Sequence, residues 1–378
     1  MMNSFETRSG PRLVFGEGRL RELPECVRSV GGTHVLLVTD PGIVAAGHAD
    51  RATRFMVDAG VKVSCYEGTH ENPGESDVEA CRAFAAGLPV DCMVGLGGGS
   101  SMDTAKGCNF LLADGGSMAD YRGYGKVRGA MRPLVAVPTT AGTGSECQSF
   151  ALVSSDESHE KMACGDPKAL ARIALLDPEL TVSQPRKVAT LTALDAMSHA
   201  LETAVCTKAN PLSRVYSKEA VRLIESAIEM VLQDAALMEH RGAMMLGASF
   251  SGLAIENSML GGAHAAANPL TARFGVVHGH AVALMLPHVM RYNRQEPSAK
   301  TSYLQLSAAL EEPVIDWAER IVALAGLPGL TACGVTREVL GDLADDATRQ
   351  WTGTFNPRPL AKEDFVRLYE QALDRETV

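Results

Sequence analysis

One carboxylate and three imidazoles near the middle of the chain have the chemistry of a catalytic metal site. Asp195 and His199 lie four residues apart in a segment without Gly or Pro, so on a helix they share one face and can bind one ion. His264 and His278 follow in segments rich in Gly and Ala, where small residues let a ligand approach the backbone. One oxygen and three nitrogen donors suit Fe(II) or Zn(II) better than Mg(II) or Ca(II). We therefore predict a metal centre made by these four side chains.

Each of these residues also has an ordinary structural interpretation. An Asp and a His four apart on a helix are more often a solvated ion pair, and a single buried histidine is more often a hydrogen-bonded core residue. The combination favours a metal, because only ten of 378 residues are histidine and two of them fall in small-residue segments downstream of the pair. We expect His280 and His288 to be at most hydrogen-bonding neighbours of the ligands.

Two glycine-rich turns are candidates for binding a nucleotide. In the first, an apolar run leads into Gly97, Gly98, Gly99, Ser100 and Ser101 and then into a helical pattern, which presents free N–H groups and a helix dipole to a pyrophosphate. The second, residues 138–146, carries hydroxyl groups able to contact the other side of the same ligand. Such turns also serve chain reversal alone, and the first lacks the G-x-G-x-x-G pattern of a standard Rossmann motif.

Asp40 ends the apolar segment 34–40 and bears on which dinucleotide binds. A carboxylate there accepts hydrogen bonds from both ribose hydroxyls and repels a 2′-phosphate, which favours NAD over NADP. The alternative is an Asp that only opens a turn before Pro41.

The elements that must position these residues fall into two parts. Short apolar runs alternate with helical patterns up to about residue 180, which predicts an α/β domain with a parallel sheet covered on both faces. The expected strands are 13–15, 34–39, 61–66, 91–96, 134–138 and 172–176, and the helices between them include 43–59, 76–86 and 101–113. A polar stretch with two prolines, 177–185, predicts an interdomain linker.

Beyond this linker the patterns are helical, and we predict an all-α C-terminal domain. The expected helices are 188–207, 211–237, 241–255, 307–325 and 362–374. The predicted domains are thus 1–180, which binds NAD, and 181–378, which binds metal and substrate. Asn356-Pro-Arg-Pro359 is expected to be a surface turn.

Composition excludes several classes of partner. The net charge of −10 and a pI near 5.5 argue against nucleic acid and anionic membranes, so the expected partners are small molecules. Nine cysteines without a C-x-x-C spacing fit a reducing compartment. The first residues include no apolar signal segment, and no apolar run approaches membrane-spanning length. We expect a cytoplasmic protein.

Six motifs in order make the chain resemble the iron-containing (group III) alcohol dehydrogenase family over nearly its full length. They are Gly97–Lys106, Pro138–Glu146, Asp177–Leu180, Asp195–Glu202, the pair His264 and His278-Gly279, and Asn356–Arg358. The resemblance implies the architecture shared with dehydroquinate synthase, which joins a Rossmann-like N-terminal domain to a helical one. It implies Asp195, His199, His264 and His278 as the metal ligands. It also implies NAD contacts at Asp40, Asn72, Gly97, Gly98, Gly99, Ser100, Ser101, Asp103, Thr139, Thr140, Thr143 and Lys161.

The expected function is hydride transfer between an alcohol and NAD, with an aldehyde or ketone reduced in the reverse direction. A divalent ion lowers the pKa of an alcohol that binds it, which favours loss of hydride to the nicotinamide. The substrate is expected to be a small alcohol or aldehyde, and the protein a homo-oligomer, a dimer in the simplest case. Gln148 and Phe150, just past the second turn, are expected to face the substrate.

Departures from the family and two alternatives stay open. Asn268 stands where many members carry histidine, so the usual proton relay is in doubt, and His280 or water is the substitute. A metal- and NAD-dependent cyclase or lyase resembling dehydroquinate synthase is one alternative, although residues 261–282 include only one cation, Arg273. A catalytically silent nucleotide-binding protein is the other.

Overall fold

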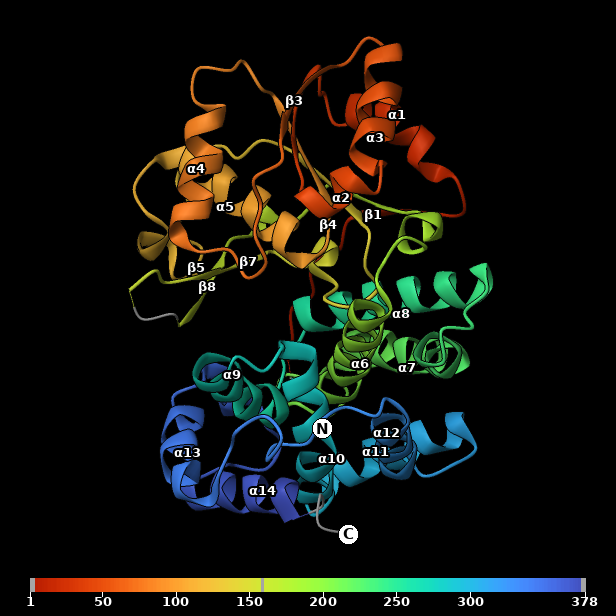
Figure 1. Ribbon diagram of the computed structural model, residues 1–378, viewed down its shortest axis with the longest axis vertical. Coiled ribbons are helices and arrows are strands. Elements are labelled where there is room, and N and C mark those ends of the chain that lie inside the picture. The colour runs from red at the N-terminus through yellow and green to blue at the C-terminus, as the bar shows by residue number, and fades with distance from the viewer. Residues whose placement is uncertain (1–3, 158–159, 375–378) are drawn as a thin grey trace. The chain divides into compact units, whose positions relative to one another are not determined.

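The computed structural model describes residues 4–157 and 160–374, which form two compact units. One unit lies between residues 9 and 184, and the other comprises the residues from 185 onward with the N-terminal segment that ends at Arg8. Figure 1 labels many of the elements of each unit. The division into domains 1–180 and 181–378 stays a prediction, since compactness alone does not show that either part folds independently.

The first unit is built on a six-stranded, fully parallel sheet with the strand order β1-β9-β6-β4-β2-β3. The strands are β1 (Arg12–Phe15), β2 (His34–Val38), β3 (Lys62–Tyr66), β4 (Cys92–Gly97), β6 (Leu134–Pro138) and β9 (Ile173–Leu176). All six predicted strands are present, which confirms the α/β fold. Their runs of Val, Leu and Ile form strands because a parallel sheet is buried on both faces.

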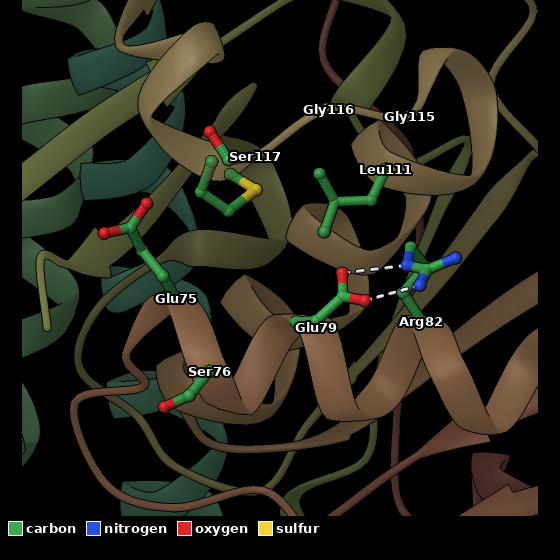
Figure 2. A pocket seen from close by; sticks show the side chains of 9 residues that line it. Glu75, Ser76, Glu79, Arg82, Leu111, Gly115, Gly116 and Ser117 are labelled. Carbon is green, nitrogen blue, oxygen red and sulfur yellow. Dashed lines mark hydrogen bonds and ion pairs between the residues drawn. The ribbon is translucent and has the colours of Figure 1, made fainter.

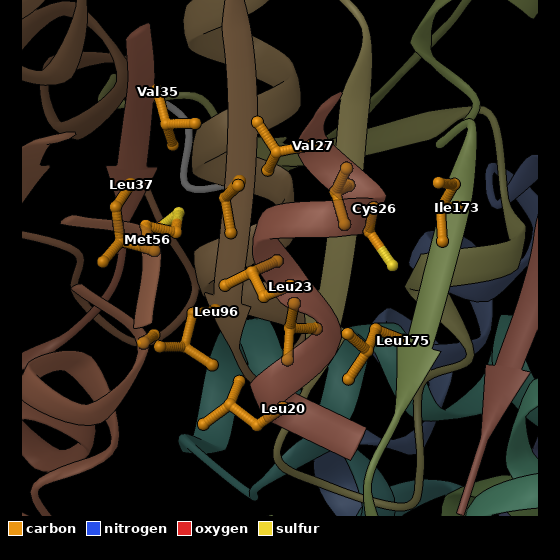
Figure 3. Packing of buried hydrophobic residues seen from close by; sticks show 14 of the residues in the cluster. Leu20, Leu23, Cys26, Val27, Val35, Leu37, Met56, Leu96, Ile173 and Leu175 are labelled. Carbon is orange, nitrogen blue, oxygen red and sulfur yellow. The ribbon is translucent and has the colours of Figure 1, made fainter. Parts of the chain in front are cut away.

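Helices cover both faces of this sheet. They are α1 (Leu23–Ser29), α2 (Pro41–Ala45), α3 (His48–Asp58), α4 (Glu75–Ala85) and α5 (Gly99–Asp114). Val35 and Leu37 point to the face covered by α1 and α3, whose packing Figure 3 shows. Leu36 and Val38, which alternate with them, point to the face covered by α4 and α5. Strand β2 is therefore packed between helices on both of its faces, and this packing fixes the position of its carboxyl end.

The order of the strands brings two carboxyl ends together. The chain passes from β2 to β3 on one side of β2, and then to β4 on its other side. Such a reversal is a topological switch point, and open α/β sheets bind ligands outside the carboxyl ends of the strands that flank it. Here these are the ends of β2, followed by Asp40, and of β4, which leads into the glycine turn.

Two features of the first unit differ from the sequence predictions. The helix predicted over 43–59 is divided into α2 and α3, because Gly47 between them has a left-handed φ of 76°. A small sheet of β5 (Gly123–Tyr124), β7 (Phe150–Ser154) and β8 (Lys161–Gly165) was not predicted. Its strands have two to five residues, and β7 and β8 pair in antiparallel fashion.

The second unit is helical, as predicted. Its helices are α6 (Arg186–Thr203), α7 (Pro211–Leu232), α8 (Met238–Glu256), α9 (Gly262–Phe274), α10 (His278–Asn293), α11 (Pro297–Leu310), α12 (Val314–Leu324), α13 (Leu340–Thr348) and α14 (Lys362–Asp374). The central helix α6 packs against α7, α8 and α10, and α9 packs against α10. Among the described residues, no helix is both long and apolar enough to span a membrane.

Prolines, and one residue with a positive φ, explain where this unit differs from the predicted helices. The helix predicted over 307–325 is two helices, because the chain turns at Glu311, with φ 60°, and at Pro313. Helices α9 and α10 were not predicted, since each contains an internal proline, Pro269 or Pro287. Tertiary packing offsets the cost of these prolines, and the alanines of α9 favour a helix.

Two polar residues predicted to lie in a linker and a surface turn are buried. Asp177 opens the predicted linker, yet it is fully buried and accepts hydrogen bonds from the backbone N–H groups of Gly18 (3.0 Å) and Leu20 (2.9 Å). The predicted surface turn 356–359 is a bend at residues 357 and 358 that leads to the exposed Pro359, but Asn356 does not lie on the surface. Its side chain is buried, and its Oδ1 accepts the N–H of Gly262 at 3.1 Å. Asn356 thus satisfies a free donor at the start of α9.

Candidate metal centre and nucleotide site

Helix α6 presents a line of polar side chains on one face. Asp195, His199 and Glu202 lie at positions i, i+4 and i+7, which point the same way on a helix. All three are buried. The Nε2 atom of His199 lies 3.5 Å from Oδ1 of Asp195.

The other two predicted ligands come from the starts of neighbouring helices. His264 lies in the first turn of α9, and its Nε2 is 3.7 Å from Oδ1 of Asp195. His278 is the first residue of α10, and its Nε2 is 3.8 Å from the same oxygen. The rings of His199 and His264 are stacked with their centroids 4.8 Å apart. The structure therefore brings all four predicted ligands together within one compact unit.

The geometry and bonding of these donors fit a bound divalent ion. Oδ1 of Asp195 and Nε2 of His264 are buried and have no hydrogen-bond partner among the described residues, which is costly for a protein unless another group satisfies them. Ligand atoms about 2.1 Å from a tetrahedral ion lie about 3.4 Å apart. Oδ1 of Asp195 lies 3.5–3.8 Å from a ring nitrogen of each histidine, and the ligand atoms of Asp195, His199 and His264 all lie within 4.8 Å of one another. The His278 side chain is 26% exposed, against 4–7% for the other three, so the centre is open beside His278.

The electrostatics of the cluster favour positive charge at its centre. Burial opposes ionisation of Asp195, but His199 and the other two histidines outweigh it and hold the pKa of this carboxyl well below its usual value. Burial also lowers the pKa of His264, yet Glu202 and Asp195 together raise it to about 9. An ion bound by these residues supplies the same positive charge.

Two residues at the centre were given no role from the sequence. Glu202 contacts Nδ1 of His264, and the spacing of Asp195, His199 and Glu202 on one helical face was the pattern that identifies it. Gly279 lies where α10 crosses α6, and a Cβ there would lie 2.9 Å from the carbonyl carbon of Leu191. Only glycine allows this approach, which places His278 beside Asp195. Sequence periodicity carries no information on such a crossing.

The predicted nucleotide residues gather at the carboxyl ends of β2, β4 and β6. Asp40 caps α2, with Oδ1 accepting the Ile43 N–H at 3.0 Å, and its Oδ2 accepts the Ser101 hydroxyl at 3.0 Å. A Cβ on Gly97, whose φ is 150°, would lie 3.0 Å from the same Oδ2. A carboxylate has about four acceptor positions, so Asp40 keeps capacity for ribose hydroxyls while it ends the turn.

The second turn lies directly against the first. The backbone N–H of Thr139 donates to the carbonyl of Gly97 at 3.0 Å. Cβ atoms on Gly98 and Gly99 would meet the side chains of Thr140 and Thr143, at 3.4 Å and 2.8 Å. The two predicted phosphate-binding turns are therefore one continuous surface, and their glycines are needed for close packing between them.

A buried network of charged and polar side chains supports the two turns. The Nζ of Lys106, on α5, donates to the Ser145 carbonyl (2.7 Å), the Ser145 hydroxyl (2.9 Å) and the Phe150 carbonyl (2.9 Å). Asp103 is buried and accepts the Ser145 hydroxyl at 3.1 Å. Burial raises the pKa of Asp103 to about 6, against the opposing charges of Lys106 and Lys161. Asp103 is thus hydrogen-bonded within the protein and supports the turns.

The remaining predicted residues lie around the same surface. Asn72 has a left-handed φ of 53°, which asparagine tolerates, and its N–H donates to the Ser100 hydroxyl at 3.2 Å. Lys161, at the start of β8, acts electrostatically on Asp103. Gln148 donates to the carbonyl of Thr143 at 2.7 Å. All twelve predicted cofactor residues thus belong to one region of the first unit.

Residues expected to relay protons or face the substrate have their own partners. The side-chain NH₂ of Asn268 donates to Gln350 at 2.9 Å. Nε2 of His280 donates to the Pro328 carbonyl at 2.6 Å, and burial lowers the pKa of this imidazole. The Phe150 ring packs on Tyr124, with centroids 5.5 Å apart. A relay through His280 and a substrate contact at Phe150 remain predictions.

A surface hollow elsewhere on the first unit does not belong to this site. It has a volume of about 530 Å³ and lies between α4 and the turn Gly115–Met118, as Figure 2 shows. Two of its charged groups pair with each other, Arg82 Nε donating to Glu79 at 2.8 Å. None of the predicted cofactor residues lines this hollow. The carboxyl ends of the strands remain the better candidate for the nucleotide site.

Comparison with known proteins agrees with this geometry over the whole chain. Residues 10–178 match the family described as iron-containing alcohol dehydrogenase, and residues 189–373 match the C-terminal part of the Fe-containing alcohol dehydrogenase family. Alcohol dehydrogenase 4 of Saccharomyces cerevisiae (strain YJM789) is 32% identical over 375 residues, which cover 96% of this chain and 97% of that protein.

Solved structures show the same similarity. A crystal structure of 1,3-propanediol oxidoreductase has a TM-score of 0.92 and 27% identity, and the match covers 98% of this chain and 100% of the other. Sulfoacetaldehyde reductase from Bifidobacterium kashiwanohense, solved in complex with NAD+, has a TM-score of 0.89 and 26% identity, with 98% and 99% covered.

These matches and the donor set do not favour the cyclase or lyase alternative or the silent protein. The one cation of the ligand segments, Arg273, is exposed and paired with Asp346. Three imidazole nitrogens around one carboxylate oxygen, and the predicted nucleotide turns at the switch point, are what an NAD-linked, metal-dependent hydride transfer requires. The chain belongs to the iron-containing alcohol dehydrogenase family and is an oxidoreductase that acts on alcohols with NAD and iron as cofactors.

Proposed function

We propose that Asp195, His199, His264 and His278 hold the iron of this alcohol dehydrogenase. The observation that carries the proposal is Oδ1 of Asp195, which is buried and accepts no hydrogen bond from residues 4–157 or 160–374. It lies 3.5–3.8 Å from one ring nitrogen of each histidine. A solvated ion pair, the ordinary alternative for an Asp and a His four apart, would be exposed, and these residues are not.

Each part of the centre has a separate task in the reaction. When bound, the divalent ion acts as a Lewis acid toward the oxygen of the alcohol or carbonyl. Asp195 keeps its negative charge, because its pKa is depressed, and so balances the ion's charge. Buried side chains of His199 and His264 exclude water from one side, and the half-buried His278 leaves the other side open to a substrate.

We propose that NAD binds along the paired turns of the first unit. The start of α5, at Gly99, offers backbone N–H groups and the positive end of a 16-residue helix to the pyrophosphate. Thr139, Thr140 and Thr143 add hydroxyls from the second turn. Asp40 accepts the adenosine ribose hydroxyls and repels a 2′-phosphate, which makes NAD the preferred cofactor.

The substrate we propose is a small alcohol or the corresponding aldehyde or ketone. Similar proteins are named for 1,3-propanediol and for sulfoacetaldehyde, one neutral and one anionic, so the family's chemistry is constant while its substrates differ. The centre itself recognises the oxygen that all these substrates share.

We also propose a cytoplasmic enzyme that works as a homo-oligomer, a dimer in the simplest case. None of the nine cysteines, all within the described residues, forms a disulfide, which suits a reducing compartment. Gel filtration with light scattering tests the oligomer, and cell fractionation tests the location.

The test of the metal centre compares metal content and NADH formation in matched variants. We expect Asp195→Ala and His264→Ala to lose iron and to lower turnover at least about 100-fold, since a catalytic ion contributes several kcal/mol to the barrier. Glu219→Ala, an exposed side chain on α7 of the same unit, should keep both. Full turnover by metal-free His264→Ala protein would refute the proposal.

A further inference from the structure

Glu202 makes two contacts that together determine how His264 faces the metal centre. Its Oε1 accepts the backbone N–H of Ala263 at 2.7 Å, and its Oε2 contacts Nδ1 of His264. The carboxylate is buried, as is the histidine. No solvent therefore competes for either contact, and charge-assisted hydrogen bonds are strongest in such surroundings.

The surrounding backbone is shaped to admit this carboxylate. Helix α9 begins at Gly262, so Ala263 carries one of its unsatisfied N–H donors. A Cβ on Gly261 would lie 3.0 Å from Oε1 of Glu202 and 3.1 Å from Oδ1 of Asn356. Two side chains from distant parts of the chain thus take the place of an ordinary helix cap, and one of them also touches the ligand histidine.

We infer that Glu202 is a positioning residue that keeps the proton of His264 on Nδ1 and leaves Nε2 to bind the ion. The inference rests on the proposed ligand set. Oε1 is already engaged by a donor, and a carboxylate only accepts, so the second contact requires a proton on Nδ1 of His264. Nε2, which faces Asp195 at 3.7 Å, is then the atom left for metal.

Replacing the carboxylate by an amide isolates this role. In Glu202→Gln one terminal atom becomes an NH₂ donor, and it must face either the Ala263 N–H or Nδ1 of His264. The amide is fully bonded only if His264 moves its proton to Nε2, the nitrogen that should bind the ion. A carboxylate that orients a ligand histidine in this way changes metal affinity by about 10- to 100-fold when it is mutated.

The matched control removes the neighbouring cap without touching His264. Asn356 accepts the Gly262 N–H at 3.1 Å and is bonded to Asn293, so Asn356→Ala weakens the start of α9 and leaves Glu202 in place. If Glu202 only stabilises the helix, the two variants should affect metal binding alike.

The experiment measures Fe(II) and Zn(II) affinity by chelator competition, together with thermal unfolding of the metal-free proteins. We expect Glu202→Gln to bind metal about 10- to 100-fold more weakly than wild type. Asn356→Ala should lower thermal stability and leave metal affinity unchanged. Equal affinities of wild type and Glu202→Gln, or an equal loss in both variants, would overturn the inference while the ligand set stands.

A second measurement uses the wild-type protein and does not depend on a variant that folds. In the Zn(II)-loaded enzyme labelled with ¹⁵N-histidine, NMR should show His264 protonated at Nδ1, and a proton on Nε2 would overturn the inference. If wild type binds metal no more tightly than His264→Ala, the proposed ligand set itself has failed.

Discussion

A single methyl group on Gly279 should displace His278, one of the proposed metal ligands. The Cβ of Gly279→Ala would lie 2.9 Å from the carbonyl carbon of Leu191 and closer still to its oxygen. Carbon atoms in contact prefer about 3.5 Å or more, so the start of α10 must retreat from α6 by at least about 0.6 Å. His278, the preceding residue, moves with it and away from Asp195, from which its Nε2 is now 3.8 Å.

The displacement is large compared with the tolerance of a metal site. Metal–ligand distances vary by only about 0.2 Å, so we expect at least an approximately 10-fold loss of iron affinity in Gly279→Ala. Overpacking should also cost about 1 to 3 kcal/mol of unfolding free energy. Chelator competition measures the first effect, and urea unfolding of the metal-free protein measures the second.

A glycine with room for a methyl group serves as the control. Gly341 lies in α13 of the same unit, and a Cβ there meets no atom within 4 Å. Gly341→Ala should keep iron affinity and turnover and leave stability equal or slightly higher, since alanine favours helix more than glycine does. Wild-type iron affinity in Gly279→Ala would refute the argument that backbone proximity positions His278.

Three other predictions follow from the first unit. Asp40→Ser keeps a side-chain acceptor for the start of α2 but loses the negative charge. The ratio of kcat/KM for NADP to that for NAD should rise at least about 10-fold, which corresponds to about 1.4 kcal/mol. An unchanged ratio in steady-state assays with both cofactors would contradict the role of Asp40. Lys106→Met removes three hydrogen bonds made by a buried side chain. It should lower the unfolding free energy by about 3 to 5 kcal/mol, measured with denaturant, and raise KM for NAD. An unfolding free energy within about 1 kcal/mol of wild type would argue that this network does not support the turns. Burial, and secondarily Arg51, lower the pKa of His48 in the folded protein, so the unfolded chain binds the proton more tightly. Stability is therefore lost as pH falls through the unfolded value of about 6.5, and His48→Asn should lose this contribution to the pH dependence of unfolding; identical slopes for the two proteins would count against it.

Much of the fold and the centre followed from local patterns. Buried strands appear as apolar runs, and the six of the parallel sheet were predicted from such runs alone. Asp195 and His199 were identified by helical spacing, and His264 and His278 by their rarity and small neighbours. Helices α9 and α10, which carry the last two, were missed because glycine, alanine and internal proline give no helical period.

The nucleotide surface shows the same division. Each turn was visible as glycines and hydroxyls after an apolar strand. That Gly99 packs on Thr143, and that Lys106 bonds to Ser145 and Phe150, depends on β4 and β6 being neighbours in the sheet. Strand order is a long-range property, and no local pattern contains it.

The sequence by itself determined the class of fold, the proposed donors of the metal centre and the proposed turns for a dinucleotide, because these depend on residue types at short spacings. Only the tertiary structure decided that Glu202 holds Nδ1 of His264, that Asn356 is a buried cap and that Gly279 lets α10 approach α6. The physical reason is that hydrogen bonds and steric contacts act over a few ångströms between segments that here lie about 60 to 95 residues apart, and only packing brings those segments together.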